Sequence, residues 1–261
     1  MDLGLSEKVA IVSGGARGIG EAIARSLIEE GARVAIFDKN ESLGSALANE
    51  LGESALFVQT DLTDEQSCQQ AIDTVLSGFG RIDILINNAS TNDGVNLNGT
   101  VDAFRASIEN NLVHYFTLSR ACKESLTENQ GCIVNIGSKV SVTGQGGSSG
   151  YVASKGATMS LTREWALELA HTSVRVNCVI PAEVDTPQYE EWLQGVDNPE
   201  ATLKKITSLI PLGQRRTTCA EVADTVAFLA SPKASHTTGQ ILFVDGGYTH
   251  LDKANVMLSD D

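Results

Sequence analysis

The sequence Val9-Ala10-Ile11-Val12-Ser13-Gly14-Gly15-Ala16-Arg17-Gly18-Ile19-Gly20 joins a short apolar run to a glycine-rich turn. The apolar run predicts a buried strand, and the pattern from about Ile19 to Glu30 predicts a helix that ends before Gly31. The glycines allow a tight turn and let the backbone approach a pyrophosphate, while the start of the helix offers free N–H groups and a positive dipole end. The spacing is Gly-x-x-x-Gly-x-Gly, which differs from the usual dinucleotide pattern Gly-x-Gly-x-x-Gly. The stretch predicts a strand–turn–helix unit that holds a phosphate group.

The same alternation of strand and helix continues along the chain. Helical patterns cover Ser42 to Leu51 and about Asp64 to Phe79, and Thr63 or Asp64 can cap the second of these. Nearly continuous apolar strands that are separated by helices favour a parallel sheet covered on both faces. The further apolar runs that predict strands are Val34–Phe37, Ala55–Val58, Ile82–Ile86, Ile133–Ile136, Val174–Ile180 and Ile241–Val244.

We therefore expect an α/β fold, with residues 1–261 forming one Rossmann-like domain. Its seven-stranded parallel sheet is doubly wound, has helices on both faces, and binds ligands at the carboxyl ends of the strands. Residues from about 187 to 212 interrupt the rhythm and read as helical, which predicts a small substrate lid. Residues from about 249 to 261 form a C-terminal tail in this interpretation.

The charge and the cysteines narrow the class of protein. A net charge of −14, from 19 basic and 33 acidic residues, predicts no nucleic-acid partner and no anionic membrane surface. No segment approaches the ~20 apolar residues that span a bilayer, and residues 1–8 do not resemble a signal peptide. The five cysteines contain no Cys-x-x-Cys pair, so we expect neither a metal site nor a disulfide framework. Reduced thiols favour a cytoplasmic location.

Asp38 follows the second predicted strand, where the adenine ribose of a dinucleotide lies in such folds. A carboxylate there accepts hydrogen bonds from both ribose hydroxyls and repels a 2′-phosphate, which favours NAD as the cofactor. Arg17 and Lys39 could each reach a 2′-phosphate, so NADP is the less favoured alternative. A second interpretation makes Asp38 a solvated turn residue.

Tyr151 and Lys155 are four residues apart, on one face of a predicted helix. Free tyrosine has a pKa of about 10, and a neighbouring ammonium favours the phenolate. Lowering that pKa by about 3 units requires roughly 4 kcal/mol, which we assign to Lys155 and a bound nicotinamide cation. The phenolate then removes the proton of a substrate hydroxyl while hydride leaves the same carbon. Ser138, at the end of the fifth predicted strand, can hold the substrate oxygen.

These motifs resemble the short-chain dehydrogenase/reductase family in its classical, single-domain form, from about Ser6 to Tyr248. The family pattern is matched by the glycine turn, Asp61, Asn87-Asn88-Ala89-Ser90, Asn111, Ser138, Tyr151-x-x-x-Lys155, Pro181 to Thr186 and Asp245-Gly246-Gly247. Two departures are Ser90 in place of the usual glycine, and Ala182-Glu183 after Pro181, which puts a carboxylate beside the nicotinamide end of the site.

The resemblance implies a role for each matched residue. Tyr151 is the base, Lys155 binds the nicotinamide ribose and lowers the pKa of that tyrosine, and Ser138 orients the substrate. Asn111 holds a water that links Lys155 to solvent. A homotetramer, built partly on the helices that carry Asn111 and Tyr151, is also implied. The implied cofactor residues are Gly14, Arg17, Gly18, Ile19, Gly20, Asp38, Asp61, Leu62, Asn88, Ala89, Ser90, Tyr151, Lys155, Pro181, Val184 and Thr186.

The substrate side of the predicted cleft is polar, which suits a small-molecule sugar better than a steroid or a long acyl chain. Trp192 fits either the lid core or a sugar platform, and Glu183 either a turn cap or the pocket; His114 and Trp165 read as packing residues. The expected substrate-binding residues are Asn92, Ser138, Lys139, Gln145, Tyr151, Glu183, Gln188 and Trp192.

Several later stretches resemble the bacterial L-fucose dehydrogenases of the same family, among them Val142-Thr143-Gly144-Gln145-Gly146 and Ile180-Pro181-Ala182-Glu183-Val184. That resemblance implies oxidation of the anomeric hydroxyl of L-fucose, or of the related L-galactose or D-arabinose, to the lactone. Two alternatives remain open. One is a carbonyl or 3-ketoacyl reductase of the same family, and the other is a cofactor-sensing protein that catalyses no reaction.

Overall fold

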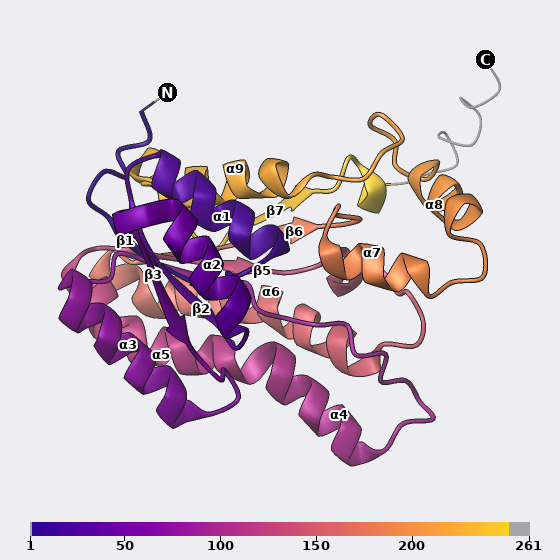
Figure 1. Ribbon diagram of the computed structural model, residues 1–261, viewed down its shortest axis with the longest axis horizontal. Coiled ribbons are helices and arrows are strands. Elements are labelled where there is room, and N and C mark those ends of the chain that lie inside the picture. Colours follow the sequence, from indigo (N-terminus) through magenta and orange to yellow (C-terminus); the bar gives the residue numbers. More distant parts are fainter. Residues whose placement is uncertain (1, 251–261) are drawn as a thin grey trace.

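The computed structural model describes residues 2–250 and centres on one parallel sheet (Figure 1). Its strands are ordered β3-β2-β1-β4-β5-β6-β7, and every neighbouring pair runs parallel. The strand order reverses between β1 and β4, which is where doubly wound sheets bind ligands. The strands are β1 (Val9–Ser13), β2 (Arg33–Asp38), β3 (Ala55–Gln59), β4 (Ile84–Asn87), β5 (Cys132–Ile136), β6 (Arg175–Pro181) and β7 (Ile241–Val244).

The helices connect these strands and cover both faces of the sheet. The longer ones are α1 (Gly18–Glu29), α2 (Glu41–Leu51), α3 (Glu65–Phe79), α4 (Val101–Ile108), α5 (His114–Glu128), α6 (Ser149–Leu169), α7 (Pro187–Gln194), α8 (Pro199–Thr207) and α9 (Cys219–Ala230). A π-turn, η2 (Glu109–Val113), joins α4 to α5. Short 3₁₀ turns are η1 (Gly52–Ser54), η3 (Lys139–Ser141), η4 (Ala170–Thr172), η5 (Pro232–Ala234) and η6 (Tyr248–His250).

Alternate residues of the strands enter two separate apolar cores. On one face, Val12 of β1 belongs to a cluster with Leu27 of α1 and Val226 of α9. On the other face, Ile11 belongs to a cluster with residues of α3, α5 and α6, including Trp165. Figure 1 shows the same division, with α1, α2 and α9 above the sheet and α3, α5 and α6 below it. Burial on both faces explains why the strands are apolar at most positions.

The structure confirms the predicted fold class and shifts the element boundaries by one or two residues. The fourth strand begins at Ile84 where the apolar run begins at Ile82, and the first helix begins at Gly18. Asp64 is the residue that caps α3, because its carboxylate accepts from the Gln66 N–H at 3.1 Å. Gly31 has φ +88° and follows Glu30, the C-cap of α1, as expected of a helix stop.

The predicted lid corresponds to two short helices. α7 and α8 occupy most of residues 187–212, and Figure 1 shows them beyond the carboxyl ends of β6 and β7. Thr186 begins α7 by accepting from the Tyr189 N–H at 3.1 Å, and Asn198 begins α8 by accepting from the Ala201 N–H at 3.1 Å. Of the predicted C-terminal tail, residues 251–261 lie outside the described part of the chain. No helix within residues 2–250 is both long and apolar enough to span a membrane.

Candidate active site

The glycine turn between β1 and α1 is too crowded for side chains. Gly14 has φ +62°, and a Cβ there would lie 2.8 Å from the Ala89 Cα atom. A Cβ on Gly20 would lie 2.1 Å from the Gly14 carbonyl oxygen. Arg17 precedes α1 with extended backbone and provides no side-chain cap, so the first N–H groups of the helix stay open to an anion. This cradle fits the pyrophosphate of a dinucleotide cofactor.

The end of β4 is fastened to that turn by Asn88 and Ser13. The Asn88 side-chain amide donates to the carbonyls of Ser13 at 2.9 Å and Gly14 at 3.0 Å. The Ser13 hydroxyl accepts from the N–H groups of Asn88 and Ala89, at 2.9 and 3.2 Å. Asn88 and Ala89 therefore shape the floor of the predicted cofactor site, and the Asn88 amide is occupied by the protein itself.

The residues predicted for the adenine end lie at the carboxyl ends of β2 and β3. Asp38 is half-buried at the tip of β2, and its carboxylate accepts from the N–H groups of Ala16 at 3.2 Å and Asn40 at 2.9 Å. Asp61 accepts from both the N–H and the hydroxyl of Thr63, and these bonds lower the pKa of its carboxyl group. Leu62 packs partly buried against the apolar core beneath.

Arg17 turns away from Asp38 and toward the lid. Its guanidinium forms an ion pair with Glu191 of α7 at 2.7 Å. Both side chains are largely exposed, so this contact is weak. It nevertheless directs the Arg17 side chain to the lid helix.

Tyr151 and Ser138 meet at the carboxyl edge of the sheet. Ser138 follows β5, is 9% exposed, and lies beside Tyr151 in the first turn of α6. Burial raises the pKa of Tyr151, and its hydrogen-bond contacts with Ser138 and Ser90 partly offset that increase. The structure thus brings together the predicted base and the predicted substrate-orienting hydroxyl. It adds Ser90, which the sequence had assigned to the cofactor.

Lys155 is completely buried and is held by two oxygen atoms. Its Nζ atom donates to the Ile136 carbonyl at 2.8 Å and to the Tyr115 hydroxyl at 3.1 Å. It lies 5.8 Å from the centre of the Tyr151 ring. Burial lowers the pKa of Lys155 to about 7. Sequence reasoning missed Tyr115, because a tyrosine inside an apolar helix pattern reads as a core residue.

Asn111 lies in the π-turn and makes different contacts. Its side-chain oxygen accepts from the Thr91 N–H at 2.7 Å, and its amide donates to the Ser107 carbonyl at 2.9 Å. It thereby fixes the loop after β4 beside the site. Its predicted role, holding a water for Lys155, stays a prediction. His114 packs edge-on against Tyr115 at 4.9 Å and is 1% exposed, and Trp165 is 7% exposed, so both are packing residues.

Two residues of the predicted substrate side form an ion pair beside Ser138. The Lys139 ammonium binds the Glu183 carboxylate, and both side chains are mostly buried. Lys139 also lies 4.2 Å from the centre of the Tyr248 ring, and burial lowers its pKa to about 8. The Glu183 carbonyl accepts from the Thr217 N–H at 2.8 Å, while its carboxylate faces Lys139. This contact favours the pocket interpretation of Glu183 over the turn cap, and a role in substrate binding stays a prediction.

The other predicted substrate residues are spread around the same edge. Gln188 of α7 donates to the Thr91 hydroxyl at 3.0 Å and so joins the lid to the loop after β4. Gln145 donates to the Ser148 hydroxyl at 2.9 Å, and Asn92 is exposed. Trp192 is 50% exposed and contacts Tyr189 edge-on at 5.3 Å, so it is not part of a closed lid core.

The remaining cofactor residues belong to the segment after β6. Pro181 is the last residue of that strand, and Val184 forms a parallel bridge with Thr217. Thr186 is occupied as the cap of α7. Within residues 2–250, no three His, Cys, Asp or Glu side chains lie together as metal ligands.

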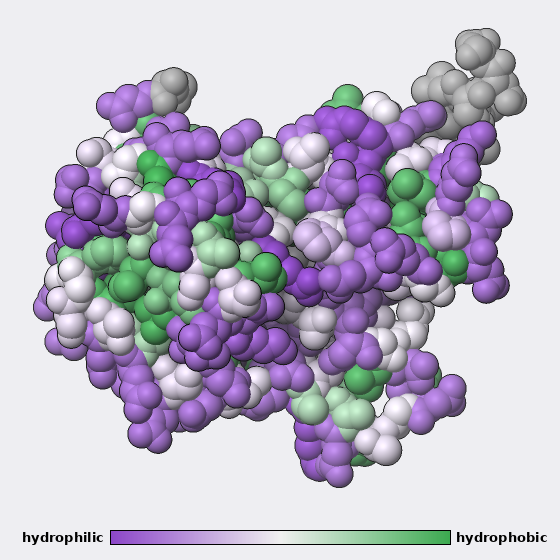
Figure 2. Space-filling model, in the orientation of Figure 1, coloured by the Kyte–Doolittle hydropathy of each residue, from purple (hydrophilic) through white to green (hydrophobic). Residues whose placement is uncertain are grey.

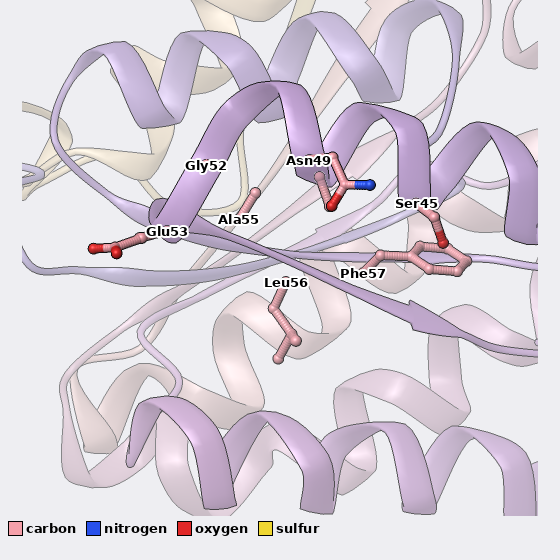
Figure 3. A pocket seen from close by; sticks show the side chains of 8 residues that line it. Ser45, Asn49, Gly52, Glu53, Ala55, Leu56 and Phe57 are labelled. Carbon is pink, nitrogen blue, oxygen red and sulfur yellow. The ribbon is translucent and has the colours of Figure 1, made fainter.

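A hollow elsewhere on the molecule is unrelated to this constellation. It lies between α2 and the edge strand β3, among residues such as Asn49, Glu53 and Phe57 (Figure 3). Gly52 and Ala55 in its lining are at the amino end of β3, whereas Ser138 and Pro181 are at carboxyl ends. Figure 2 shows a hydrophobic area on this side of the molecule, over the region of α2 and β3, whereas most of the rest of the same face is hydrophilic.

Known proteins resemble this chain over nearly its whole length. A family model described as enoyl-(acyl carrier protein) reductase matches residues 14–249. The L-fucose dehydrogenase of Mus musculus is 40% identical over 244 residues, which are 93% of this chain and 88% of that protein.

Solved structures agree. The crystal structure of Cj0485 dehydrogenase matches with a TM-score of 0.93 and 44% identity, over 97% of this chain and 98% of that one. The ligand-free aldohexose dehydrogenase of Thermoplasma acidophilum matches with a TM-score of 0.88 and 31% identity, over 97% of this chain and 98% of that one. The 3-ketoacyl-(acyl-carrier-protein) reductase of Brucella melitensis, complexed with NADH, matches with a TM-score of 0.85 and 30% identity, over 94% of this chain and 99% of that one. With these matches, the chain belongs to the short-chain dehydrogenase/reductase family, whose members are oxidoreductases that use NAD(P) cofactors.

Proposed function

We propose that this protein is an NAD-dependent sugar dehydrogenase that oxidises the anomeric hydroxyl of L-fucose, or of a stereochemically related sugar, to the lactone. The observation that carries the proposal is the mostly buried Lys139–Glu183 ion pair, whose lysine directly follows Ser138 in the chain. Two charged groups at the substrate end of the site suit a ligand rich in hydroxyl groups and oppose an apolar one.

The proposed reaction assigns one task to each side chain. Ser138 donates to the substrate oxygen and orients it toward Tyr151. The Tyr151 oxygen takes the hydroxyl proton as the carbon–hydrogen bond breaks, and Lys155 stabilises the phenolate that this requires. When bound, NAD supplies the acceptor of the hydride. Since burial raises the pKa of Tyr151 in the ligand-free protein, Lys155 has to provide much of the opposing stabilisation.

Asp38 supports NAD as the cofactor. Its half-buried carboxylate is fixed at the tip of β2 by two backbone N–H groups, so a 2′-phosphate placed there meets a fixed negative charge. Arg17, which could have offset that charge, is directed to Glu191. The related 3-ketoacyl reductase was solved with NADH.

The relatives support a sugar as the substrate. L-fucose dehydrogenase and aldohexose dehydrogenase both oxidise sugars by name, and both match this chain over most of its length. Ring stereochemistry is shared among L-fucose, L-galactose and D-arabinose, so all three belong in the test.

The test is the increase in reduced-nicotinamide absorbance with L-fucose, run with NAD and with NADP, and with D-fucose as the stereochemical control. We expect turnover with L-fucose and NAD, and at least tenfold less with NADP. Asp38→Asn should narrow that cofactor ratio without changing the preference for L-fucose. Binding of NAD without turnover of any of the sugars would refute the sugar assignment.

A reductase acting on 3-ketoacyl substrates is the second candidate. It is favoured by the similarity to the Brucella melitensis 3-ketoacyl reductase and by the description of the matching family model. Reduction of acetoacetyl thioesters with NADPH, faster than any sugar oxidation, would establish it. The Lys139–Glu183 pair opposes it, because an acyl chain placed against the pair would displace water from both charges and offer no hydrogen bond in return.

The assembly and location complete the proposal. Phe116 of α5 is 53% exposed and Leu167 of α6 is 79% exposed, which supports a homotetramer that covers these helices. Light scattering on the purified protein distinguishes a tetramer from a monomer. All five cysteines are free thiols, which supports a cytoplasmic location; fractionation of the source cells tests it.

A further inference from the structure

Lys155 is a buried cation without a counter-ion. Within residues 2–250, no carboxylate forms an ion pair with it, and its Nζ atom is bonded only to the Ile136 carbonyl and the Tyr115 hydroxyl. A buried ammonium is stable only where hydrogen bonds replace its hydration. Within residues 2–250, two neutral oxygen atoms are therefore its only hydrogen-bond partners, beside the rings of Tyr115 and Tyr151, whose centres lie 5.2 and 5.8 Å from Nζ.

The Tyr115 hydroxyl is fixed for this task. It is fully buried and donates its own proton to the Ile136 carbonyl at 3.0 Å, so its lone pairs face the Lys155 ammonium. Its ring is pinned by the edge-on contact with His114. The π-turn Glu109–Val113 directly precedes α5 and sets the register that turns Tyr115 toward α6.

The other titratable groups near Lys155 are neutral at pH 7. Tyr151 lies on the same helix as Lys155, His114 faces it from α5, and Cys178 faces it from β6. Burial lowers the pKa of His114 to about 4 and raises that of Cys178 to about 12. Neither group supplies a charge that could replace the Tyr115 hydroxyl.

When the pair formed by Tyr151 and Lys155 loses one proton, either side chain can be the one that loses it. Loss from the lysine leaves a neutral pair, whereas loss from the tyrosine leaves the phenolate beside an ammonium, and the two forms have the same total charge. Only the second form can accept a proton from substrate. We propose that Tyr115 is a positioning residue that keeps this shared proton on Lys155 and so favours the phenolate form of Tyr151. The inference rests on the proposed roles of Tyr151 and Lys155.

Tyr115→Phe tests this with little change of shape. A hydrogen bond to a charged group shifts an ionisation equilibrium by about tenfold to a hundredfold. In the pH profile of kcat/KM, we expect the value on the high-pH plateau to fall by about that factor. The ascending part of the profile should move by about 1–2 pH units toward lower pH, because Lys155 then loses its proton more easily. Higher pH should not restore the rate.

A second measurement does not use activity. NMR of ¹³Cε-lysine in the ligand-free protein, with the Lys155 resonance assigned by its loss in Lys155→Met, should show titration near the pKa of about 7 and at lower pH in Tyr115→Phe. Thr117→Val removes a hydroxyl from the same helix as Tyr115. Among the described residues 2–250 that hydroxyl bonds only the Val113 carbonyl, so the variant should change neither readout.

The outcomes separate clearly. Tyr115 would be no more than a packing residue if the Lys155 titration were unchanged, or if activity fell while the ascending part of the pH profile of kcat/KM stayed in place. If Tyr115→Phe does not fold, incorporation of 3-fluorotyrosine into Tyr151→Phe weakens the Tyr115 acceptor at nearly constant shape. The Lys155 titration should again move to lower pH, and a fixed titration refutes the proposal. The Lys155 titration can be measured even if the protein does not oxidise L-fucose. Failure of the sugar assignment is therefore distinguishable from failure of the proposed role of Tyr115.

Discussion

Tyr151 lies between two opposing influences at the scale of the single residue. Burial raises the pKa of its hydroxyl, while Ser138 and Ser90 stabilise the charged form. The Lys155 ammonium lies 5.8 Å from the centre of its ring and has one hydrogen without a partner among residues 2–250. The catalytic question is therefore how strongly these three neighbours offset burial.

Tyr151→Phe removes the oxygen on which the proposed proton transfer depends. We expect kcat to fall by about 10²–10⁴-fold, the usual contribution of a general base, while binding of the cofactor to the glycine turn is retained. Steady-state kinetics and a fluorescence titration with NADH measure the two effects. Tyr189→Phe is the matched control, since its buried hydroxyl has no hydrogen-bond partner within residues 2–250. Equal losses in both variants would contradict the assignment of Tyr151.

At the scale of the element, Asp83 ties the starts of β1 and β4 together. Its carboxylate is 2% exposed and accepts from Lys8 at 2.9 Å, from Arg81 at 2.6 Å and from the Val9 N–H at 3.0 Å. Burial alone would raise the pKa of Asp83, but these three donors outweigh it and lower the pKa. The carboxylate therefore stabilises the fold wherever it is ionised.

Asp83→Asn should lower the free energy of unfolding by about 2–3 kcal/mol at pH 7, toward the low end for a broken buried pair because Lys8 and Arg81 are partly exposed. Since the folded-state pKa is depressed, this stabilisation is complete above the unfolded pKa of about 3.9 and is lost as the pH falls through the folded value. Denaturant unfolding at pH 7 and in acid measures the difference. Asp73 is exposed, so Asp73→Asn should have little effect. If the difference in unfolding free energy between the native protein and Asp83→Asn grew in acid, the depressed folded-state pKa of Asp83 would be contradicted.

The elements differ in how far the sequence predicts them. All seven strands were predictable because each is a mostly apolar run, and capping residues such as Asp64 mark the helix starts. The π-turn was not, because Glu109–Val113 continues an ordinary helical pattern. Tyr115 depends on the register that this turn sets, so its contact with Lys155 could not be predicted either.

On the substrate side, too, the sequence predicts which residues face the pocket but not which contacts they make. Lys139 and Glu183 were both predicted to face the pocket, because they follow neighbouring strands. That they bind each other depends on rotamers and burial, which the sequence does not specify. The pairing is the feature that turns two separate polar residues into a fixed charged surface.

At the scale of the whole molecule, Arg216 ties both ends of the lid region to each other. It follows α8, is mostly buried, and binds Asp185 at 2.8 Å and Glu190 at 2.5 Å. Its guanidinium lies 4.9 Å from the centre of the Tyr189 ring. Two ion pairs and a cation–π contact thus hold α7 over the carboxyl edge of the sheet.

Arg216→Ala should loosen the lid without touching the proposed catalytic residues. We expect KM for the sugar to increase about fivefold, equivalent to about 1 kcal/mol, with a smaller change in kcat. Faster proteolysis within residues 187–212 should accompany it. Arg215→Ala removes the same charge from the neighbouring position, where the partner is Glu221 on α9, and should leave KM unchanged. A loss confined to kcat would argue that Arg216 does not act through the lid.

The ion pair between Arg17 and Glu191 has a consequence for the order of binding. If the Arg17 guanidinium is drawn to the phosphates of an arriving dinucleotide, as its proposed role requires, Glu191 loses its partner and α7 loses a tether. Thermodynamic reciprocity then makes the opened lid favour the dinucleotide by the same factor. An exposed pair contributes at most about 1 kcal/mol, so the coupling is about fivefold or less. That is enough to bias the protein toward admitting its dinucleotide before its sugar, and too little to impose a compulsory sequence.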